Sequence, residues 1–164
     1  MDQERSQVGV IIGRFQLPQL HTEHKKLIQY VLDRHKKVIL FLGVPLKLGT
    51  KRNPLDFTSR KYMVEEEFGN KLVILPLSDN PSDEEWSKQL DLKVREVFPQ
   101  ESVTLYGSKD SFIPYYHGEF KCESLVPDNY VSATDIREQC SKEILSSMGF
   151  RAGIIYAVYN YNPE

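Results

Sequence analysis

The fold is decided by the stretch VGVIIGRFQLPQLHTEH, residues 8–24. Its first part, Val8 to Ile12, is a short apolar run typical of a buried strand, and Gly13 allows a tight exit from that strand. A helix is expected from His21 to about Lys36, because apolar residues recur there on one face. The stretch therefore predicts a strand that passes through a polar turn into a helix.

The same alternation of short apolar runs and helical periodicity continues along the chain. Further strands are expected at Val38 to Gly43, Leu72 to Leu75, Val103 to Tyr106 and Phe120 to Val126. Further helices are expected at Phe57 to Phe68, Asp83 to Phe98 and Thr134 to Met148. This order predicts an α/β fold, a Rossmann-like doubly wound parallel sheet of about five strands. Ligands of such sheets bind beyond the carboxyl ends of the strands, so functional residues should follow the strands.

The composition limits the classes of protein to which this chain can belong. Its 164 residues, 40% hydrophobic and 27% charged, suit one globular domain. The net charge of −2 argues against a surface that binds nucleic acid all over. No apolar run could span a membrane or act as a signal core, and Cys122 and Cys140 have no metal or disulfide spacing. We therefore expect a cytoplasmic protein with no nucleic-acid or membrane partner; a homo-oligomer is compatible with the sequence.

The turn after the first strand carries residue types that bind phosphate. His21 and His24 are three apart, so they share one face of a first helical turn, where free N–H groups and the helix dipole attract anions. Arg14 can bind the same phosphates through its planar guanidinium. The alternative is a pair of surface histidines. A zinc site is disfavoured because the pair needs further ligands, so no protein-held metal is expected.

Cationic residues gather after the second strand. Lys47, Lys51, Arg52 and Arg60 form the densest cationic segment of the chain. A solvated loop is the usual fate of such a segment, but its position after a strand favours an anion site.

The ends of the third and fourth strands carry an acidic residue, an indole and a glycine. Asp79 is followed seven residues later by Trp86. The indole can stack on an electron-poor ring, or it can belong to the core stripe of its helix, and periodicity does not separate the two. Gly107 permits close approach of the backbone to a nucleotide, although alone it indicates only a turn.

The last expected helix begins with a polar segment, VSATDIR, residues 131–137. Ser132 is a good N-cap and Asp135 resembles a capping-box partner, so capping is one interpretation. The other is a second phosphate site, because free N–H groups, the hydroxyls of Ser132 and Thr134, and Arg137 converge on one helix start.

Together these motifs resemble the nucleotidyltransferase superfamily with a His-x-Gly-His signature. Gly-Arg-Phe-Gln followed by His-x-x-His is similar to its first motif, and residues 132–137 are similar to its second, Ser-x-Thr-x-x-Arg. The resemblance covers nearly the whole chain, and it is strongest to the nicotinamide-mononucleotide (NMN) adenylyltransferase domain of bifunctional adenylyltransferase–Nudix hydrolase proteins. It implies ATP and NMN as substrates, NAD and pyrophosphate as products, and Mg²⁺ bound mainly through the ATP phosphates.

The resemblance also assigns residues to roles. It implies catalytic roles for His21, His24 and Arg137. ATP binding is implied for Gly13, Arg14, Phe15, Gly107, Lys109, Asp110, Ser132 and Thr134. Acceptor binding is implied for Arg52, Asn53, Asp79 and Trp86.

One departure from the first motif keeps alternatives open. Glu23 stands where the signature has Gly, and a carboxylate beside a triphosphate is repulsive unless it turns away or meets a metal. A nucleotide-binding module with impaired catalysis is therefore an alternative. Another is a nucleotidyltransferase for a different phosphorylated acceptor, of the cytidylyl- or pantetheine-phosphate adenylyltransferase kind.

The resemblance also divides the chain. Residues 1–149 are expected to form the nucleotidyltransferase domain, and residues 150–164 resemble the segment that leads to the Nudix domain in such relatives. The chain ends where that domain would begin, so we expect either a stand-alone family member or a separated domain.

Overall fold

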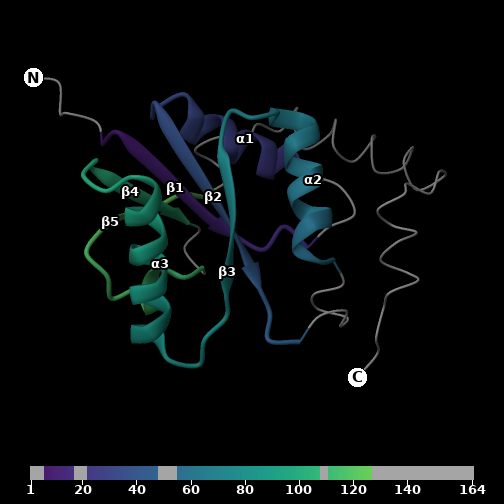
Figure 1. Ribbon diagram of the computed structural model, residues 1–164. Coiled ribbons are helices and arrows are strands. Elements are labelled where there is room, and N and C mark those ends of the chain that lie inside the picture. The colour runs from purple at the N-terminus through teal and green to yellow at the C-terminus, as the bar shows by residue number, and fades with distance from the viewer. Residues whose placement is uncertain (1–5, 17–21, 48–54, 108–110, 127–164) are drawn as a thin grey trace, which may run out of the picture.

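The computed structural model describes residues 6–16, 22–47, 55–107 and 111–126, which form a parallel sheet with helices on both faces (Figure 1). The strands are β1 (Val8–Gly13), β2 (Lys37–Val44), β3 (Val73–Ser78), β4 (Val103–Gly107) and β5 (Lys121–Ser124). Their order is β3-β2-β1-β4-β5, and every neighbouring pair is parallel. The predicted α/β fold with a five-stranded, doubly wound parallel sheet is therefore confirmed. The strand order reverses at β1, which places the switch point between β1 and β4.

Two hydrophobic cores lie on opposite faces of the sheet. The helices α1 (Thr22–Leu32) and α2 (Phe57–Phe68) pack on one face, and α3 (Asp83–Val97) packs on the other (Figure 1). Strand β2 serves both cores, because Leu40 and Leu42 point to one and Ile39 and Phe41 to the other. This double burial explains why the strands read as continuous apolar runs.

Two boundaries differ by more than two residues from the sequence-based expectation. Helix α1 ends at Leu32 rather than near Lys36, because the chain turns there and His35 becomes buried between segments. Its Nδ1 lies 2.7 Å from the Ser6 carbonyl oxygen and its Nε2 lies 2.6 Å from the Tyr106 hydroxyl. Strand β3 runs on through Pro76 to Ser78, since an edge strand tolerates a residue without an N–H.

The helix starts follow from local capping. The Asp56 carboxylate accepts a hydrogen bond from the Ser59 N–H at 2.7 Å, which begins α2 where the sequence predicts it. The Ser82 hydroxyl caps α3 in the same way, through the N–H of Glu85. Within the described ranges, no helix is long and apolar enough to cross a membrane. The helix expected at Thr134 to Met148 and the tail at 150–164 lie outside the described residues.

Candidate functional site

A cleft of about 660 Å³ lies at the carboxyl ends of the strands. Its walls come from the ends of β1 and β2, from the β3 exit with the start of α3, and from residues 111–115 after β4. Four residues predicted from the sequence line it together: Gly13, Arg14, Asp79 and Trp86. The size suits a small-molecule site, and the position is the one that a doubly wound sheet gives to its ligand.

An ion pair spans the cleft. Nη2 of Arg14 donates to both oxygens of the Asp79 carboxylate at 2.7 Å. The two side chains are 46% and 33% exposed, so a ligand can reach both. The residue assigned to phosphates thus contacts the residue assigned to the acceptor, and a phosphate in the cleft would compete with Asp79 for the guanidinium.

A buried guanidinium supports this ion pair from beneath. Arg60 is fully buried in α2, and its Nη1 donates to the carbonyl oxygens of Arg14 at 2.8 Å and Gly43 at 2.7 Å. Its Nε donates to the carbonyl oxygen of Asp56 at 3.1 Å. Burial, and next the charge of Arg14, lowers the pKa of Arg60. Arg60 therefore fixes the ends of β1 and β2 against the start of α2.

The sequence groups Arg60 with the cationic residues of a loop segment, and the structure corrects this interpretation. The residue lies on the buried stripe of α2, four positions before Val64. That spacing was the available signal, since it is the spacing of neighbours on a helix face.

Gln16 is another residue without an assigned role that the structure ties to the site segments. Its Nε2 donates to the Leu55 carbonyl oxygen at 2.9 Å, and its Oε1 accepts from the Leu55 N–H at 2.8 Å. This paired contact joins the first motif to the residue that directly follows Arg52-Asn53-Pro54.

His24 lies in the first turns of α1 against an aromatic ring. The rings of Phe15 and His24 meet edge to face with centroids 4.6 Å apart. Phe15 is buried and has a φ of 49°, and a Cβ at Gly13 would come 3.0 Å from its ring. A residue without a side chain at position 13 therefore gives Phe15 the room to fold back beside His24. The Glu23 side chain, next to His24, is exposed, where water screens its charge.

Trp86 belongs to both the cleft and the core. Its indole lines the cleft and packs at the edge of the core that contains Leu90 and Val94, both fully buried. Its ring centroid lies 5.9 Å from that of Phe112. The two interpretations left open by the sequence are therefore compatible, because the Trp86 side chain packs against the core and also borders the cleft.

The segment after β4 adds aromatic residues that the sequence did not assign to the site, and together with Trp86 they form what we call the aromatic wall: Trp86, Phe112 and Tyr115. Ser111, Phe112 and Tyr115 line the cleft. A Cβ at Gly107 would lie 2.5 Å from the Ser111 hydroxyl and 2.6 Å from the Phe112 ring. Gly107 is thus required by the chain folding back on itself. The cluster of aromatic residues in this segment, from Phe112 to Tyr116, was the available signal.

The remaining predicted residues fall into two groups. Phe15, His24 and Gly107 are described but are not among the residues that line the cleft. His21, Arg52, Asn53, Lys109, Asp110, Ser132, Thr134 and Arg137 lie outside the described residues. Over the described ranges, no group of three or more His, Cys, Asp or Glu residues is arranged to hold a metal ion.

Comparison with known protein sequences finds a similar nucleotidyltransferase and no matching family. No protein-family model matches the chain. Nicotinamide-nucleotide adenylyltransferase 1 of Sulfolobus acidocaldarius is 26% identical over 86 residues, which are 49% of this chain and 48% of that protein. The chain therefore spans about half the length of this curated relative.

Solved structures show the same fold. A bifunctional NMN adenylyltransferase/ADP-ribose pyrophosphatase from Francisella tularensis superposes with a TM-score of 0.66 and 27% identity, covering 83% of this chain and 42% of that one. A second structure of it, complexed with AMP and a manganese ion, has a TM-score of 0.64 and 28% identity, covering 81% and 41%. A NadR protein in complex with NAD and AMP-PNP shares the fold at 20% identity, with a TM-score of 0.60 over 85% of this chain and 44% of its own. In sequence and in fold, this chain is therefore similar to the NMN adenylyltransferases and to their bifunctional relatives, as its motifs indicated.

Proposed function

We propose that this chain transfers the adenylyl group of ATP to NMN, giving NAD and pyrophosphate. The observation that carries the proposal is the cleft at the strand ends, in which Arg14, Asp79 and Trp86 meet. It offers a cation for phosphates and an indole for a flat ring, in a fold similar to that of NMN adenylyltransferases. The structure of one such relative is complexed with AMP and manganese, which supports a nucleotide and a divalent cation as ligands here.

The reaction needs alignment more than it needs a strong base. A phosphate oxygen of NMN attacks the α-phosphorus of ATP, a new P–O bond forms, and the bond to the bridging oxygen of the leaving pyrophosphate breaks. The attacking phosphate is already anionic at neutral pH. Catalysis then depends on holding the two phosphates in line and on neutralising the charge that develops.

The cationic residues would divide this work. Arg14, at the end of β1, would bind phosphate oxygens beside the reacting centre, and His24 would donate from the first turns of α1. Because of the family motifs, we assign His21 and Arg137 to the triphosphate of ATP. Arg137 would stabilise the negative charge that develops on the leaving pyrophosphate. Arg60 would hold the backbone of Arg14 in place.

A divalent cation fits this site through oxygen donors. The carboxylates of Asp79 and Asp83 line the cleft, and carboxylate oxygens are the donors that Mg²⁺ prefers. When bound, mainly through the ATP phosphates, Mg²⁺ supplies positive charge to the departing pyrophosphate.

Trp86 and Asp79 favour a pyridine nucleotide over other acceptors. The pyridinium of NMN carries a positive charge that suits an indole face, and Asp79 would lie near the same ring. A cytidylyl- or pantetheine-phosphate adenylyltransferase gives these two residues no role. The exposed position of Glu23 favours an active enzyme over a nucleotide-binding module.

The test is a pyrophosphate-release assay with ATP and with CTP against a panel of phosphorylated acceptors that includes NMN, nicotinate mononucleotide, phosphopantetheine and glycerol phosphate. We expect release with ATP and a pyridine mononucleotide, together with NAD in the product. Release with CTP or with phosphopantetheine alone would contradict the acceptor. ATP binding without release from any acceptor would contradict the transferase.

A further inference from the structure

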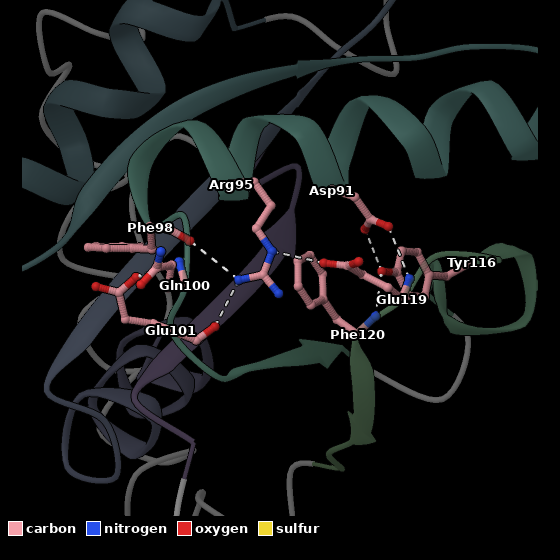
Figure 2. Close-up of polar contacts among 8 residues, drawn as sticks. All are labelled: Asp91, Arg95, Phe98, Gln100, Glu101, Tyr116, Glu119 and Phe120. Atoms are coloured by element: carbon pink, nitrogen blue, oxygen red, sulfur yellow. Dashed lines mark hydrogen bonds and ion pairs between the residues drawn. The ribbon is translucent and has the colours of Figure 1, made fainter.

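A polar network joins α3 to residues 116–120, the segment that leads into β5 (Figure 2). The Asp91 carboxylate accepts from the Tyr116 hydroxyl at 2.5 Å and from the Glu119 N–H at 3.0 Å. The Tyr116 oxygen in turn accepts from the Phe120 N–H at 3.1 Å. We call Asp91 and Tyr116 the clamp, because together they bind one helix to one loop.

The clamp is built for a protonated tyrosine. Burial, and next the hydrogen bond to Asp91, raises the pKa of Tyr116 far above its ordinary value. The hydroxyl therefore remains a donor to the carboxylate throughout the neutral range. A Cβ at Gly118 would overlap both Tyr116 and Asp91, so the loop must pass the clamp at a glycine. A hydrogen bond to a charged group in a partly buried place is among the stronger ones in a protein.

The two elements that the clamp joins are those that form the aromatic wall of the cleft. Trp86 lies on α3, five positions before Asp91, while Phe112 and Tyr115 lie four positions and one position before Tyr116. The Phe112 ring is in contact with both Trp86 and the clamp residue Tyr116, with its centroid 5.9 Å from that of Trp86 and 6.3 Å from that of Tyr116.

A further hydrogen bond reinforces the clamp on the side of the cleft. The His117 N–H donates to the hydroxyl of the buried Ser87 at 3.0 Å, and Ser87 is the neighbour of Trp86 on α3. The loop is therefore fixed to α3 on the turns from which Trp86 projects.

We propose that Asp91 and Tyr116 are positioning residues for the acceptor: they hold the Phe112 ring against Trp86, and so fix the orientation of the indole on which the pyridine ring stacks. This inference rests on the proposed function for the identity of the ring. Neither clamp residue is among those that line the cleft, so they act through the wall.

The chain offers a matched control on the same pair of elements. Arg95, one helical turn beyond Asp91, binds Glu119 with its Nε at 2.8 Å (Figure 2). Its Nη1 also donates to the carbonyl oxygen of Glu101 at 2.9 Å. Arg95 therefore lies near the C-terminal end of α3, whereas Trp86 lies near its N-terminal end. The substitution Glu119→Gln removes this ion pair and leaves the clamp in place.

The experiment compares Tyr116→Phe and Glu119→Gln with the wild type by steady-state kinetics and by acrylamide quenching. Trp86 is the single tryptophan of the chain, so its fluorescence reports on the wall alone. For Tyr116→Phe we expect the KM for NMN to rise by about two- to tenfold, the effect of one hydrogen bond, with the KM for ATP nearly unchanged. We also expect Trp86 to become more accessible to acrylamide. Glu119→Gln should leave both KM values and the quenching as in the wild type.

Several results would overturn the inference. A folded Tyr116→Phe protein with unchanged quenching, or with equal rises in both KM values, shows that the clamp does not position the wall. An equal effect of Glu119→Gln shows general loosening of the loop. If Tyr116→Phe does not fold, Asp91→Asn is measured in the same way. The quenching is measured without substrates, so it shows whether the clamp positions the wall even if the wild type makes no NAD. The absence of NAD would contradict only the proposed function.

Discussion

At the scale of single residues, the contact between Arg14 and Asp79 determines how the cleft meets a phosphate. Half-exposed ion pairs contribute about 0.2–1 kcal/mol, so a triphosphate can displace the Asp79 carboxylate from the guanidinium. The exchange nevertheless costs part of the binding free energy. Asp79 would therefore weaken ATP binding even as it helps to bind the acceptor.

The substitution Asp79→Asn tests this trade. It removes the competing charge, so we expect ATP to bind up to about fivefold more tightly, as measured by calorimetry with metal-free ATP and without an acceptor. Asp83→Asn is the matched control, because Asp83 lines the same cleft and loses the same charge without being the partner of Arg14. Equal tightening in both variants would show a general effect of net charge, and no tightening in either would contradict the competition.

His24 offers a second prediction at this scale. If it donates to the phosphates, His24→Ala should lower kcat by about a hundredfold or more, the usual cost of one donor that follows developing charge. The melting temperature of the His24→Ala variant should stay close to that of the wild type despite this loss of activity.

His35 is the control for a histidine that serves structure, because it is buried between Ser6 and Tyr106. His35→Ala should lower the melting temperature and leave the activity of the folded protein nearly unchanged. Parallel losses of stability and activity in His24→Ala would make it a second core histidine.

At the scale of secondary-structure elements, the sequence predicted what local pattern determines. Every strand expected before residue 127 forms, because apolar runs identify strands that are buried on both faces. The cleft could be expected as well, since Arg14, Asp79 and Trp86 follow strands that end at one edge of a sheet. The spacing of Arg60 from Val64 signals its burial, but the partners of Arg60 and the clamp could not be expected, because these hydrogen bonds join segments 17 to 46 residues apart and leave no periodic trace.

Helix α3 carries a prediction that separates packing from recognition. Trp86→Ala should weaken NMN binding by about 0.5–2 kcal/mol, the size of one cation–π contact, beyond any loss from loosened packing. ATP affinity should stay nearly the same, as measured by titration of each ligand alone.

Leu90→Ala gives the packing contribution by itself. Leu90 lies four residues along the same helix face and is fully buried, so its truncation should destabilise the fold by about 2–5 kcal/mol without selecting between the ligands. An equal effect of Trp86→Ala on both ligands would remove the reason to prefer NMN as the acceptor.

At the scale of the whole molecule, the clamp makes the free energy of unfolding decrease at alkaline pH. The raised pKa of Tyr116 means that above about pH 10 the unfolded chain loses a proton that the folded chain keeps. Raising the pH then favours unfolding, by up to about 1.4 kcal/mol per pH unit for one such group. The contribution is fully present below pH 10 and is lost as the pH rises.

Denaturant unfolding of the wild type and of Tyr116→Phe from about pH 7 to about pH 11 measures this effect. The stability advantage of the wild type should be constant up to about pH 9 and should shrink above about pH 10. The constant region serves as the internal control. An advantage that stays the same through pH 11 would show that Tyr116 ionises as easily in the folded protein as in the unfolded chain.

The order of the strands also has a consequence for synthesis on the ribosome. Strand β1 pairs with β4, and the partners Val8 and Val103 are 95 residues apart in the sequence (103 − 8). Until that second partner has emerged, the nascent chain can pair β1 only with β2, and one edge of the central strand stays open to other chains. Phe112 and Tyr115 are translated later still, so substrates can stabilise only a chain that extends past these residues. A fragment that stops at Phe98 should therefore aggregate, and ATP or NMN should not protect it.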